Sequence, residues 1–471
     1  MNPAISLRAS ILLLSAATAT AGPAAGGETF RRIKAAIDAV PAIDTHDHLW
    51  PFERLCTAGP EPGVEAMSLW RLWQHTTLSW IRPLTTRAAG EPFDDWWSRA
   101  RNDFADVRAT SFYRFMLPAL ADLYGVDFDR ITDDQARDLD RRIVEHYRDP
   151  RWFYHVVTER ANVELVFTDP YWDPLRMSAA YPFEVPVLNI NCLVGGFHPS
   201  ETAGYPPADP YRLAAELGLP AGSLDEYVAL VDRIIATARQ RGVACVKQTL
   251  AYWRTLRFEN VPREKAAEAF GRPKSELTWE QITAFQDFIM WRIVESCARH
   301  DLPLQIHTGQ ARIQGSSPML LVDLIEANPA TRFILFHGGF PWVGETGVIV
   351  MRHASHVWVD CVWLPMLSES TARRAFHEWL EVMPSSRILW GADTANAEGL
   401  YGATALMRRC WAEVLAEKVE AGRLTEPDAV RIGRQIFRDN ALELFPGIRQ
   451  RLWKHKGPMV PPPPPEGWPQ P

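Results

Sequence analysis

Two histidines near the start of the chain have a spacing that suits metal binding. They lie in the run Ala42-Ile43-Asp44-Thr45-His46-Asp47-His48-Leu49, an apolar segment that ends in polar residues. Side chains of a strand alternate between its two faces, so His46 and His48 point the same way, about 6–7 Å apart. Histidine is the commonest metal ligand among side chains. An isolated pair of this kind is more often structural, so its interpretation depends on residues far downstream.

Four further apolar runs each carry one ionisable residue near their end. These residues are Lys247, His307, His337 and Asp393. Burial of an ionisable side chain is costly unless the group is paired or binds a metal. Three or four nitrogen and oxygen ligands with an open position are typical of a catalytic divalent metal site. The recurrence therefore predicts such a site rather than a set of unrelated core residues.

The same residues suit the chemistry of hydrolysis. A Zn²⁺ ion lowers the pKa of the water that it binds to about 7. A carboxylate beside that water can take its proton and pass it to a leaving group. Asp393 is the natural candidate for this role. His337 suits the polarisation of a carbonyl group or the role of an acid.

The elements that must position these residues alternate regularly along the chain. After the first strand at residues 42–49, strand-length apolar runs are Glu164–Thr168, Val185–Leu193, Ala244–Leu250, Pro303–Thr308, Arg332–His337, Val357–Trp363 and Ile388–Asp393. Helical patterns cover Leu224–Arg241, Thr278–His300, Pro318–Ala327, Ala372–Val382, 399–421 and 425–444. This alternation predicts an α/β fold with a parallel sheet. Eight units fit a (β/α)₈ TIM barrel, whose active site lies at the carboxyl ends of its strands. A doubly wound open sheet remains the alternative.

Three segments depart from the alternation. Residues 50–150 are rich in tryptophan and then helical in pattern, which predicts a helical insertion after the first strand of a barrel spanning 28–446. Residues 1–21 combine Arg8, an apolar stretch and an Ala-x-Ala site, as in an export signal. We therefore expect a periplasmic or extracellular protein; a disordered Ala-rich extension is the alternative. Residues 457–471 form a proline-rich tail.

Composition excludes several classes of function. The chain of 471 residues is 47% hydrophobic and 23% charged, with a net charge of −7 and no basic run, so nucleic-acid binding is not expected. No apolar run has the length of a membrane span. The six cysteines are scattered and give no disulfide framework. A small-molecule substrate is expected, and an oligomer remains open.

The order of His46-Asp47-His48, His307, His337 and Asp393 resembles the amidohydrolase superfamily. Four further stretches look like its amidohydrolase-2 group, namely 247–252, 304–309, 337–341 and 437–442. The insertion, including residues 119–125, is similar to that of uronate isomerases. The resemblance implies that His46, His48, His307 and Asp393 are metal ligands and that His337 faces the substrate.

Lys247 is the doubtful ligand in this comparison. In two-metal relatives a lysine on this strand is carbamylated and bridges the ions, whereas one-metal relatives lack that role. We favour one divalent metal, with Zn²⁺ as the expected ion. An unmodified Lys247 would instead bind a substrate carboxylate or pair with a buried aspartate.

The resulting expectation is a metal-dependent hydrolase of a C–N or C–O bond, of amide or lactone type. The alternatives are a non-oxidative decarboxylase or uronate-type isomerase that uses the same site, and a non-catalytic binding protein with a vestigial site. Arg254 and Arg312 follow the fourth and fifth strands and would bind a substrate carboxylate at the rim, or be plain surface residues.

Overall fold

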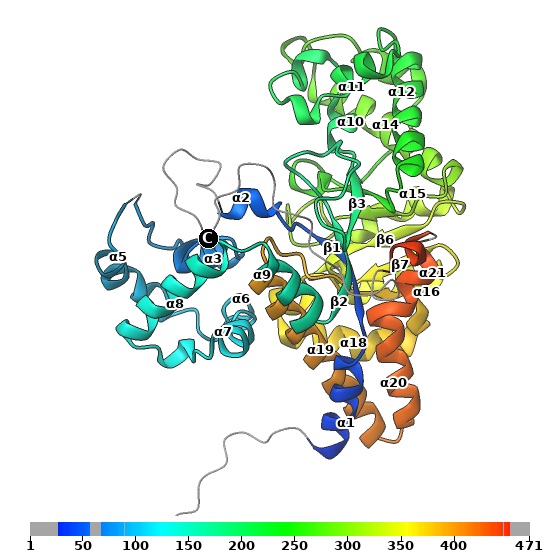
Figure 1. The fold of residues 1–471 in the computed structure, drawn as a ribbon. Coiled ribbons are helices and arrows are strands. Elements are labelled where there is room, and N and C mark those ends of the chain that lie inside the picture. Colours follow the sequence, from blue (N-terminus) through cyan, green and yellow to red (C-terminus); the bar gives the residue numbers. More distant parts are fainter. Residues whose placement is uncertain (1–26, 57–66, 89, 446, 453–471) are drawn as a thin grey trace, which may run out of the picture.

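Eight parallel strands follow one another in sequence order around a single sheet (Figure 1). The computed structural model describes residues 27–56, 67–88, 90–445 and 447–452. The strands are β1 (Ala42–Asp47), β2 (Val163–Thr168), β3 (Glu184–Asn189), β4 (Cys245–Gln248), β5 (Leu304–Ile306), β6 (Phe333–Leu335), β7 (Val357–Asp360) and β8 (Ile388–Leu389). The predicted α/β class and (β/α)₈ barrel are confirmed.

The last strand closes the barrel against the first. The backbone N–H of Thr45 donates to the carbonyl of Trp390 at 3.1 Å, and that of Asp393 donates to the carbonyl of His46 at 3.0 Å. Between these bonds lies Gly391, where a Cβ atom would sit 2.9 Å from both the backbone N and O of His46. The close approach of two backbones therefore requires glycine at this position.

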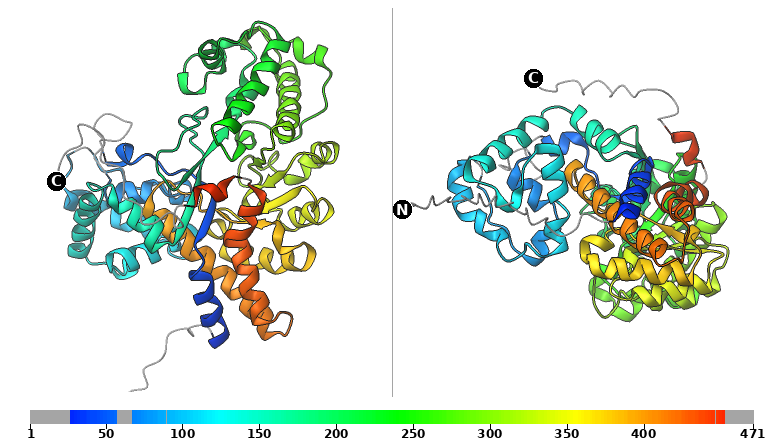
Figure 2. Two further views of the ribbon diagram at one scale, coloured as in Figure 1. Left: turned by 45° about the vertical axis from the view of Figure 1, so that its right-hand side comes forward. Right: turned by 90° about the horizontal axis from the view of Figure 1, so that it is seen from below.

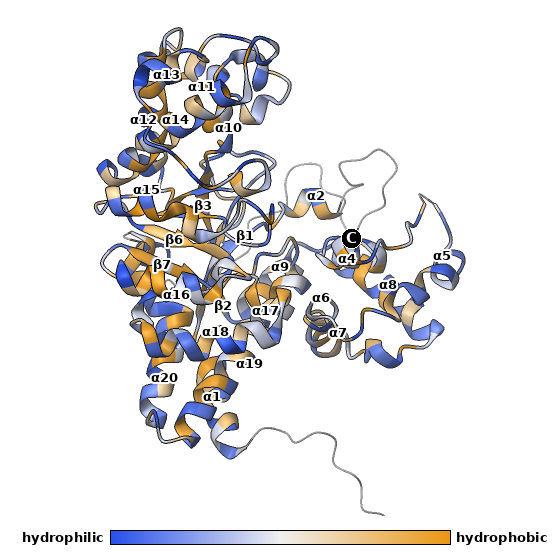
Figure 3. Cartoon of the chain, turned by 180° about the vertical axis from the view of Figure 1, so that it is seen from behind, coloured by the Kyte–Doolittle hydropathy of each residue, from blue (hydrophilic) through white to orange (hydrophobic). Residues whose placement is uncertain are grey.

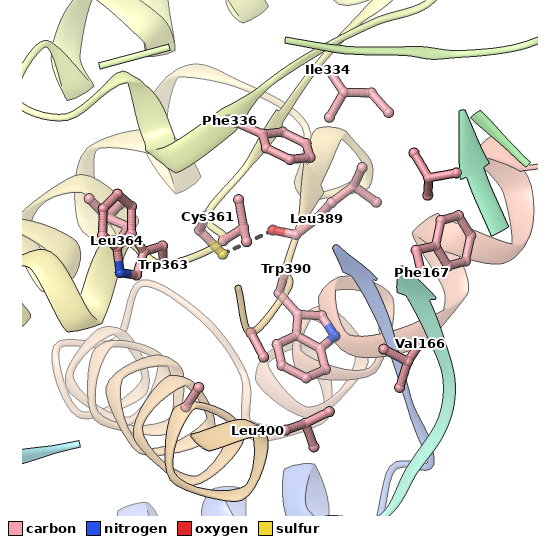
Figure 4. Packing of buried hydrophobic residues seen from close by; sticks show 14 of the residues in the cluster. Val166, Phe167, Ile334, Phe336, Cys361, Trp363, Leu364, Leu389, Trp390 and Leu400 are labelled. Atoms are coloured by element: carbon pink, nitrogen blue, oxygen red, sulfur yellow. Dashed lines mark hydrogen bonds between the residues drawn. The ribbon is translucent and has the colours of Figure 1, made fainter. Parts of the chain in front are cut away.

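Every residue of the eight strands is buried. The strands are mainly apolar, apart from buried polar residues such as Asp44, Lys247 and Gln305 (Figure 3). Side chains fill the barrel inside and helices cover it outside, which suits a parallel sheet. Figure 4 shows part of this core, including Phe167, Ile334 and Trp390.

The outer helices pack against the barrel and against one another. They are α1 (Glu28–Asp38), α9 (Arg151–Tyr154), α15 (Val322–Ala327), α16 (Val343–Arg352), α17 (Leu364–Leu367), α18 (Glu369–Val382), α19 (Ala397–Glu420), α20 (Glu426–Arg434) and α21 (Asn440–Leu444). The predicted helix at 425–444 contains a wider turn at Gln435–Asp439 between α20 and α21. The sequence patterns did not include α16.

A helical insertion follows β1 and lies to one side of the barrel (Figures 1 and 2), as predicted. Its helices are α2 (Phe52–Cys56), α3 (Leu69–Gln74), α4 (Leu78–Ile81), α5 (Phe93–Ala100), α6 (Ser111–Arg114), α7 (Leu117–Tyr124) and α8 (Asp133–His146). The buried carboxylate of Glu398 on α19 ties it to the barrel by accepting hydrogen bonds from Tyr124, Tyr147 and Trp152.

A second helical lobe extends the barrel after β3 and β4, at the top of Figure 1. It comprises α10 (Asn191–Gly195), α11 (Pro210–Leu217), α12 (Leu224–Gln240), α13 (Arg263–Ala267) and α14 (Trp279–Arg299). The predicted strand to Leu193 was therefore too long, because β3 ends at Asn189 and α10 begins two residues later. Among the described residues no helix has the length and apolar character needed to cross a bilayer. The predicted leader 1–21 and tail 457–471 lie outside those residues.

Candidate metal centre

His46, His48 and Asp393 converge where β1 and the segment after β8 reach the mouth of the barrel. One ligand atom from each lies within 4.8 Å of the others. The Nε2 atoms of His46 and His48 are 3.5 and 3.2 Å from Oδ1 of Asp393. The alternation of side chains along β1 places both imidazoles on one face, as their spacing predicted.

The hydrogen bonds around this trio leave room for a cation. Nδ1 of His48 lies 2.8 Å from the backbone carbonyl of Asp169. A carbonyl only accepts, so Nδ1 carries the hydrogen and Nε2 of a neutral ring turns a lone pair toward the Asp393 carboxylate. Two acceptors at 3.2 Å repel each other unless a proton or a metal ion lies between them. The donor set and its geometry therefore fit a divalent metal ion.

In the metal-free protein a proton takes that place. Burial lowers the pKa of His48, but the Asp393 carboxylate outweighs it and raises this pKa to about 9. Burial opposes ionisation of Asp393, but the two histidines hold its pKa well below the ordinary value. Burial and the Lys247 charge lower the pKa of His46, which stays neutral. A metal ion would therefore displace one proton from the trio.

His307 lies outside the compact trio and contacts His337. Nδ1 of His307 is 2.9 Å from Nε2 of His337, whose Nδ1 lies 3.3 Å from the carbonyl of Val362. Burial lowers the pKa of both rings, that of His307 to about 3. Two neutral rings carry two N–H groups, which suffice for a chain from His307 through His337 to Val362. Nε2 of His307 lies 3.3 Å from the backbone carbonyl of Gln310 and would have to leave this contact to bind a metal ion or substrate.

Backbone strain gathers at the carboxyl ends of three neighbouring strands. His337, Trp363 and Asp393 have φ angles of 58°, 63° and 59°, in the left-handed region that residues with a Cβ rarely adopt. Such strain costs about 1–3 kcal/mol per residue and tends to occur where function requires it. Nδ1 of His337 lies 3.7 Å from Oδ2 of Asp393, so two of the strained side chains face each other.

Lys247 projects from β4 into the polar interior of the barrel, where it is almost fully buried. Its Nζ lies 3.6 Å from the ring centre of Phe336, and none of the ion pairs within 4.0 Å in the described part of the chain involves it. Burial lowers its pKa to about 8, although Asp169, Asp393 and Asp360 oppose this shift. The expected pairing with a buried aspartate is therefore not a direct contact.

The two arginines proposed to bind substrate have different surroundings. Arg254 is buried, and its guanidinium donates to Oδ1 of Asp287 at 2.5 Å and to Gln286 at 3.1 Å. The exposed Arg312 donates to the carbonyl of Trp253 at 2.8 Å. Arg254 lines a cavity beside the trio, whereas Arg312 lines neither of the two cavities there.

Two cavities meet at the trio, and His48, Tyr171 and Tyr252 line both. The larger chamber, of about 730 Å³, lies toward the second lobe and has polar side chains from β3, α10, the loop after β4 and α14: Asn189, Asn191, Thr249 and Gln286. The smaller chamber, of about 390 Å³, lies between the barrel and the insertion and includes Asp393. Such concave spaces beside a metal site suit a small-molecule substrate.

Several residues of this site were not singled out from the sequence. Asp169 and Asp360 directly follow or end buried strands, the same signal that identified His307 and Asp393. Tyr171, Tyr252 and Trp363 come from the loops after β2, β4 and β7. Aromatic residues in loops gave no signal of their own, because most tryptophans of this chain pack in cores.

Known proteins resemble this chain in sequence and in fold. Residues 211–447, half of the chain, match the family model for amidohydrolases. A curated relative, the protein fluG of Emericella nidulans, is 29% identical over 149 residues, which are 30% of this chain and 17% of that protein. The chain thus spans less than a fifth of that relative's length.

Solved structures share the fold at low sequence identity. A uronate isomerase from Thermotoga maritima has a TM-score of 0.69 at 14% identity and covers 89% of this chain and 98% of its own. A glucuronate isomerase from Caulobacter crescentus has a TM-score of 0.66 at 15% identity, with coverage of 94% and 96%. A candidate metal-dependent hydrolase from Lactobacillus casei has a TM-score of 0.58 at 17% identity, with coverage of 89% and 98%. These overlaps must include part of the insertion, because residues outside 50–150 make up less than four fifths of the chain.

Proposed function

This chain belongs to the amidohydrolase family, and from that premise we propose that it is a metal-dependent hydrolase of a C–N or C–O bond in a small molecule. The bond would be of amide or lactone type, and the ion one Zn²⁺. The observation that carries the proposal is the convergence of two imidazole nitrogens and a carboxylate oxygen at the junction of two cavities. A divalent ion bound there supplies Lewis-acid chemistry, which activates water and polarises a carbonyl group.

The side chains around the trio have separable roles in this reaction. His46 and His48 would hold the ion, and the Asp169 carbonyl fixes the ring of His48 so that Nε2 faces the site. Asp393 accepts the proton of the attacking water and returns it to the leaving group. The neutral His337, whose Nδ1–H contacts the Val362 carbonyl at 3.3 Å, would turn this N–H toward the developing oxyanion. His307 orients His337 through their 2.9 Å contact; as a further ligand it would give up the contact of its Nε2 with the Gln310 carbonyl.

A uronate-type isomerase or a decarboxylase remains the second candidate. It is favoured by the names of two of the similar structures, a uronate isomerase and a glucuronate isomerase. The lining of the two chambers speaks against an anionic sugar. Of the described residues that line them, Arg254 alone carries a basic Lys or Arg side chain, and Asp287 already neutralises it.

Metal content and turnover together test the proposal. The full chain, purified without chelator, should contain about one equivalent of zinc, and chelation should abolish hydrolysis of amides and lactones until zinc is restored. His46→Ala should lose the metal, and Asp393→Asn should lower kcat by roughly 10²–10⁴ in a folded protein. The control is His155→Ala, which alters an exposed histidine that lines neither chamber.

The outcomes distinguish the candidates. Much less than one equivalent of metal would indicate a vestigial site in a binding protein. Full turnover by Asp393→Asn would contradict the role given to this carboxylate. Absence of solvent ¹⁸O from the product would favour isomerisation or decarboxylation over hydrolysis.

We also propose that the protein is exported to the periplasm or the extracellular space. The support is the leader-like pattern of residues 1–21 alone. Mass spectrometry of the protein from its native host should find a mature N-terminus close to Ala21. An intact Met1 in the cell-associated fraction would contradict this.

A further inference from the structure

Five aromatic side chains line the smaller chamber, together with polar residues that include His75, Thr76, Asn396 and Asp393. The aromatic side chains come from both the insertion and the barrel: Trp80 and Phe115 from the former, and Tyr171, Tyr252 and Trp363 from the latter. The rings of Trp80 and Trp363 are 5.4 Å apart and edge-on. A cavity of about 150 Å³ can hold benzene, so about 390 Å³ is ample for a substituted ring. Flat apolar walls favour a planar group.

The charges around this chamber disfavour an anion. Its described lining contains the Asp393 carboxylate but no lysine or arginine. The half-buried His75 also lines it, and burial lowers the pKa of its ring to about 4, so it is neutral at pH 7. Apart from the metal ion that we propose at the trio, a carboxylate on the substrate would find no cationic side chain among the described lining of this chamber and would lie close to Asp393. A charge without a protein partner there would weaken binding.

Trp363 brings an unused hydrogen-bond donor to the chamber. Its side chain is 3% exposed, and its indole Nε1 is one of the buried polar atoms in the described structure that lack a partner. Its backbone is left-handed at φ 63°, and its ring lies 5.3 Å from that of His337. A buried donor without a partner is destabilising. Strain and an unpaired donor in one residue beside a catalytic histidine suggest that a ligand uses them.

We propose that the smaller chamber binds an uncharged planar group of the substrate and that Trp363 donates its indole N–H to an acceptor on that group. The inference rests on the proposed function, whose substrate class it names. The substrate would have two arms joined at the scissile bond. The planar arm lies against the edge-on pair of Trp80 and Trp363, and the other arm enters the polar larger chamber. His48, Tyr171 and Tyr252 line both chambers, so the scissile bond lies beside them at the trio.

The test uses the zinc-loaded full chain and three aryl amides. 4-Acetamidobenzamide and 4-acetamidobenzoate have the same shape, but only the second is charged, and acetanilide lacks any acceptor on its ring. We expect kcat/KM for the neutral benzamide to exceed that for the benzoate by at least about tenfold. Trp363→Phe keeps an aromatic ring but removes the N–H, so it should lower kcat/KM about tenfold for the benzamide and little for acetanilide.

Two variants complete the design. Trp80→Ala alters a side chain that is 56% exposed, so it should fold normally and weaken all three substrates. Trp73→Phe is the matched control, since its Nε1 is also buried without a partner but packs against Phe104 and Tyr113 in the insertion core. It should leave the preference among the three amides unchanged.

Each result decides the inference. Equal turnover of 4-acetamidobenzoate and 4-acetamidobenzamide would contradict the preference for an uncharged group, but it would still support hydrolase activity. An equal loss for benzamide and acetanilide in Trp363→Phe would overturn the role of the N–H. If no amide is hydrolysed, the proposed function fails for amides. Calorimetry then compares the binding of neutral 4-acetamidobenzamide with that of charged 4-acetamidobenzoate. Tighter binding of the neutral compound, weakened by Trp363→Phe, supports the inference, and tighter binding of the anion overturns it.

Discussion

Replacing Glu398 with glutamine is expected to loosen the insertion from the barrel. The Glu398 side chain is fully buried at the start of α19, five residues after Asp393. It accepts hydrogen bonds from the hydroxyls of Tyr124 at 2.7 Å and Tyr147 at 2.5 Å, and from the indole of Trp152 at 2.8 Å. Burial and this carboxylate raise the pKa of both tyrosines, so both remain donors at any physiological pH.

The expected cost follows from the two oxygens of this carboxylate. Oε1 serves Tyr124 and Trp152, and Oε2 serves Tyr147. Glutamine keeps one oxygen, so two bonds survive without the charge and the third meets an NH₂ group. Hydrogen bonds to a charged group contribute about 1.5–3 kcal/mol each and neutral ones about 1. Glu398→Gln should therefore cost about 3 kcal/mol of the free energy that docks the insertion.

Hydrogen exchange measured by mass spectrometry reports this cost locally. A loss of about 3 kcal/mol should speed exchange of amides in α7 and α8 by roughly a hundredfold, with little change in the strands. Tyr401→Phe is the matched control. Its hydroxyl also joins α19 to the insertion, through Asp122 at 2.8 Å, but this bond is exposed. We expect an effect there below about 1 kcal/mol.

The reasoning would be refuted if Glu398→Gln left exchange in α7 and α8 at the wild-type rate. It would fail equally if Tyr401→Phe gave the same acceleration, because burial and charge would then not set the difference.

Three further predictions concern the barrel and its rim. Gly391→Ala would place a methyl group 2.9 Å from the backbone of His46, so we expect a loss of about 2 kcal/mol in stability and a lower metal content; an unchanged Tm with full metal would contradict this. Burial, then Arg71, lowers the pKa of His75 to about 4, so between pH 6.5 and 4 the unfolded chain binds a proton that the folded one does not. Stability should fall over this range by at most roughly 3 kcal/mol, and His75→Gln should flatten the slope of unfolding against pH; parallel slopes would count against the assignment. Arg254→Met should cost about 3–5 kcal/mol by leaving buried Asp287 unpaired, and the double variant with Asp287→Leu should recover part of it. A raised KM at unchanged stability would instead assign Arg254 to substrate binding.

Local physics explains why the fold was predictable from the sequence. Strands buried on both faces are largely apolar, so the eight runs could be recognised without any tertiary information. Their alternation with helices allowed few topologies. Polar residues such as His46 and Asp393 stood out because they interrupt such runs. The barrel then brings the carboxyl ends of all strands to one side.

Tertiary structure alone decided which of these residues meet. His46, His48 and Asp393 form the trio, whereas His307 turns its Nδ1 toward His337. The sequence predicted that Arg254 would bind a substrate carboxylate, but in the structure it forms an ion pair with Asp287 on α14.

The assembly of the second lobe and of the two chambers could not be predicted from the sequence either, because it depends on the packing of segments that follow different strands. Trp363 is an example. Its indole N–H has no hydrogen-bond partner in the fold, and the residues around it in the sequence do not show this. The sequence by itself determined the alternation of strands and helices and the strand ends that carry polar residues, but it left a barrel and an open sheet as alternatives. Only the tertiary structure decided the metal trio and the smaller chamber, because both are formed by residues far apart in the sequence.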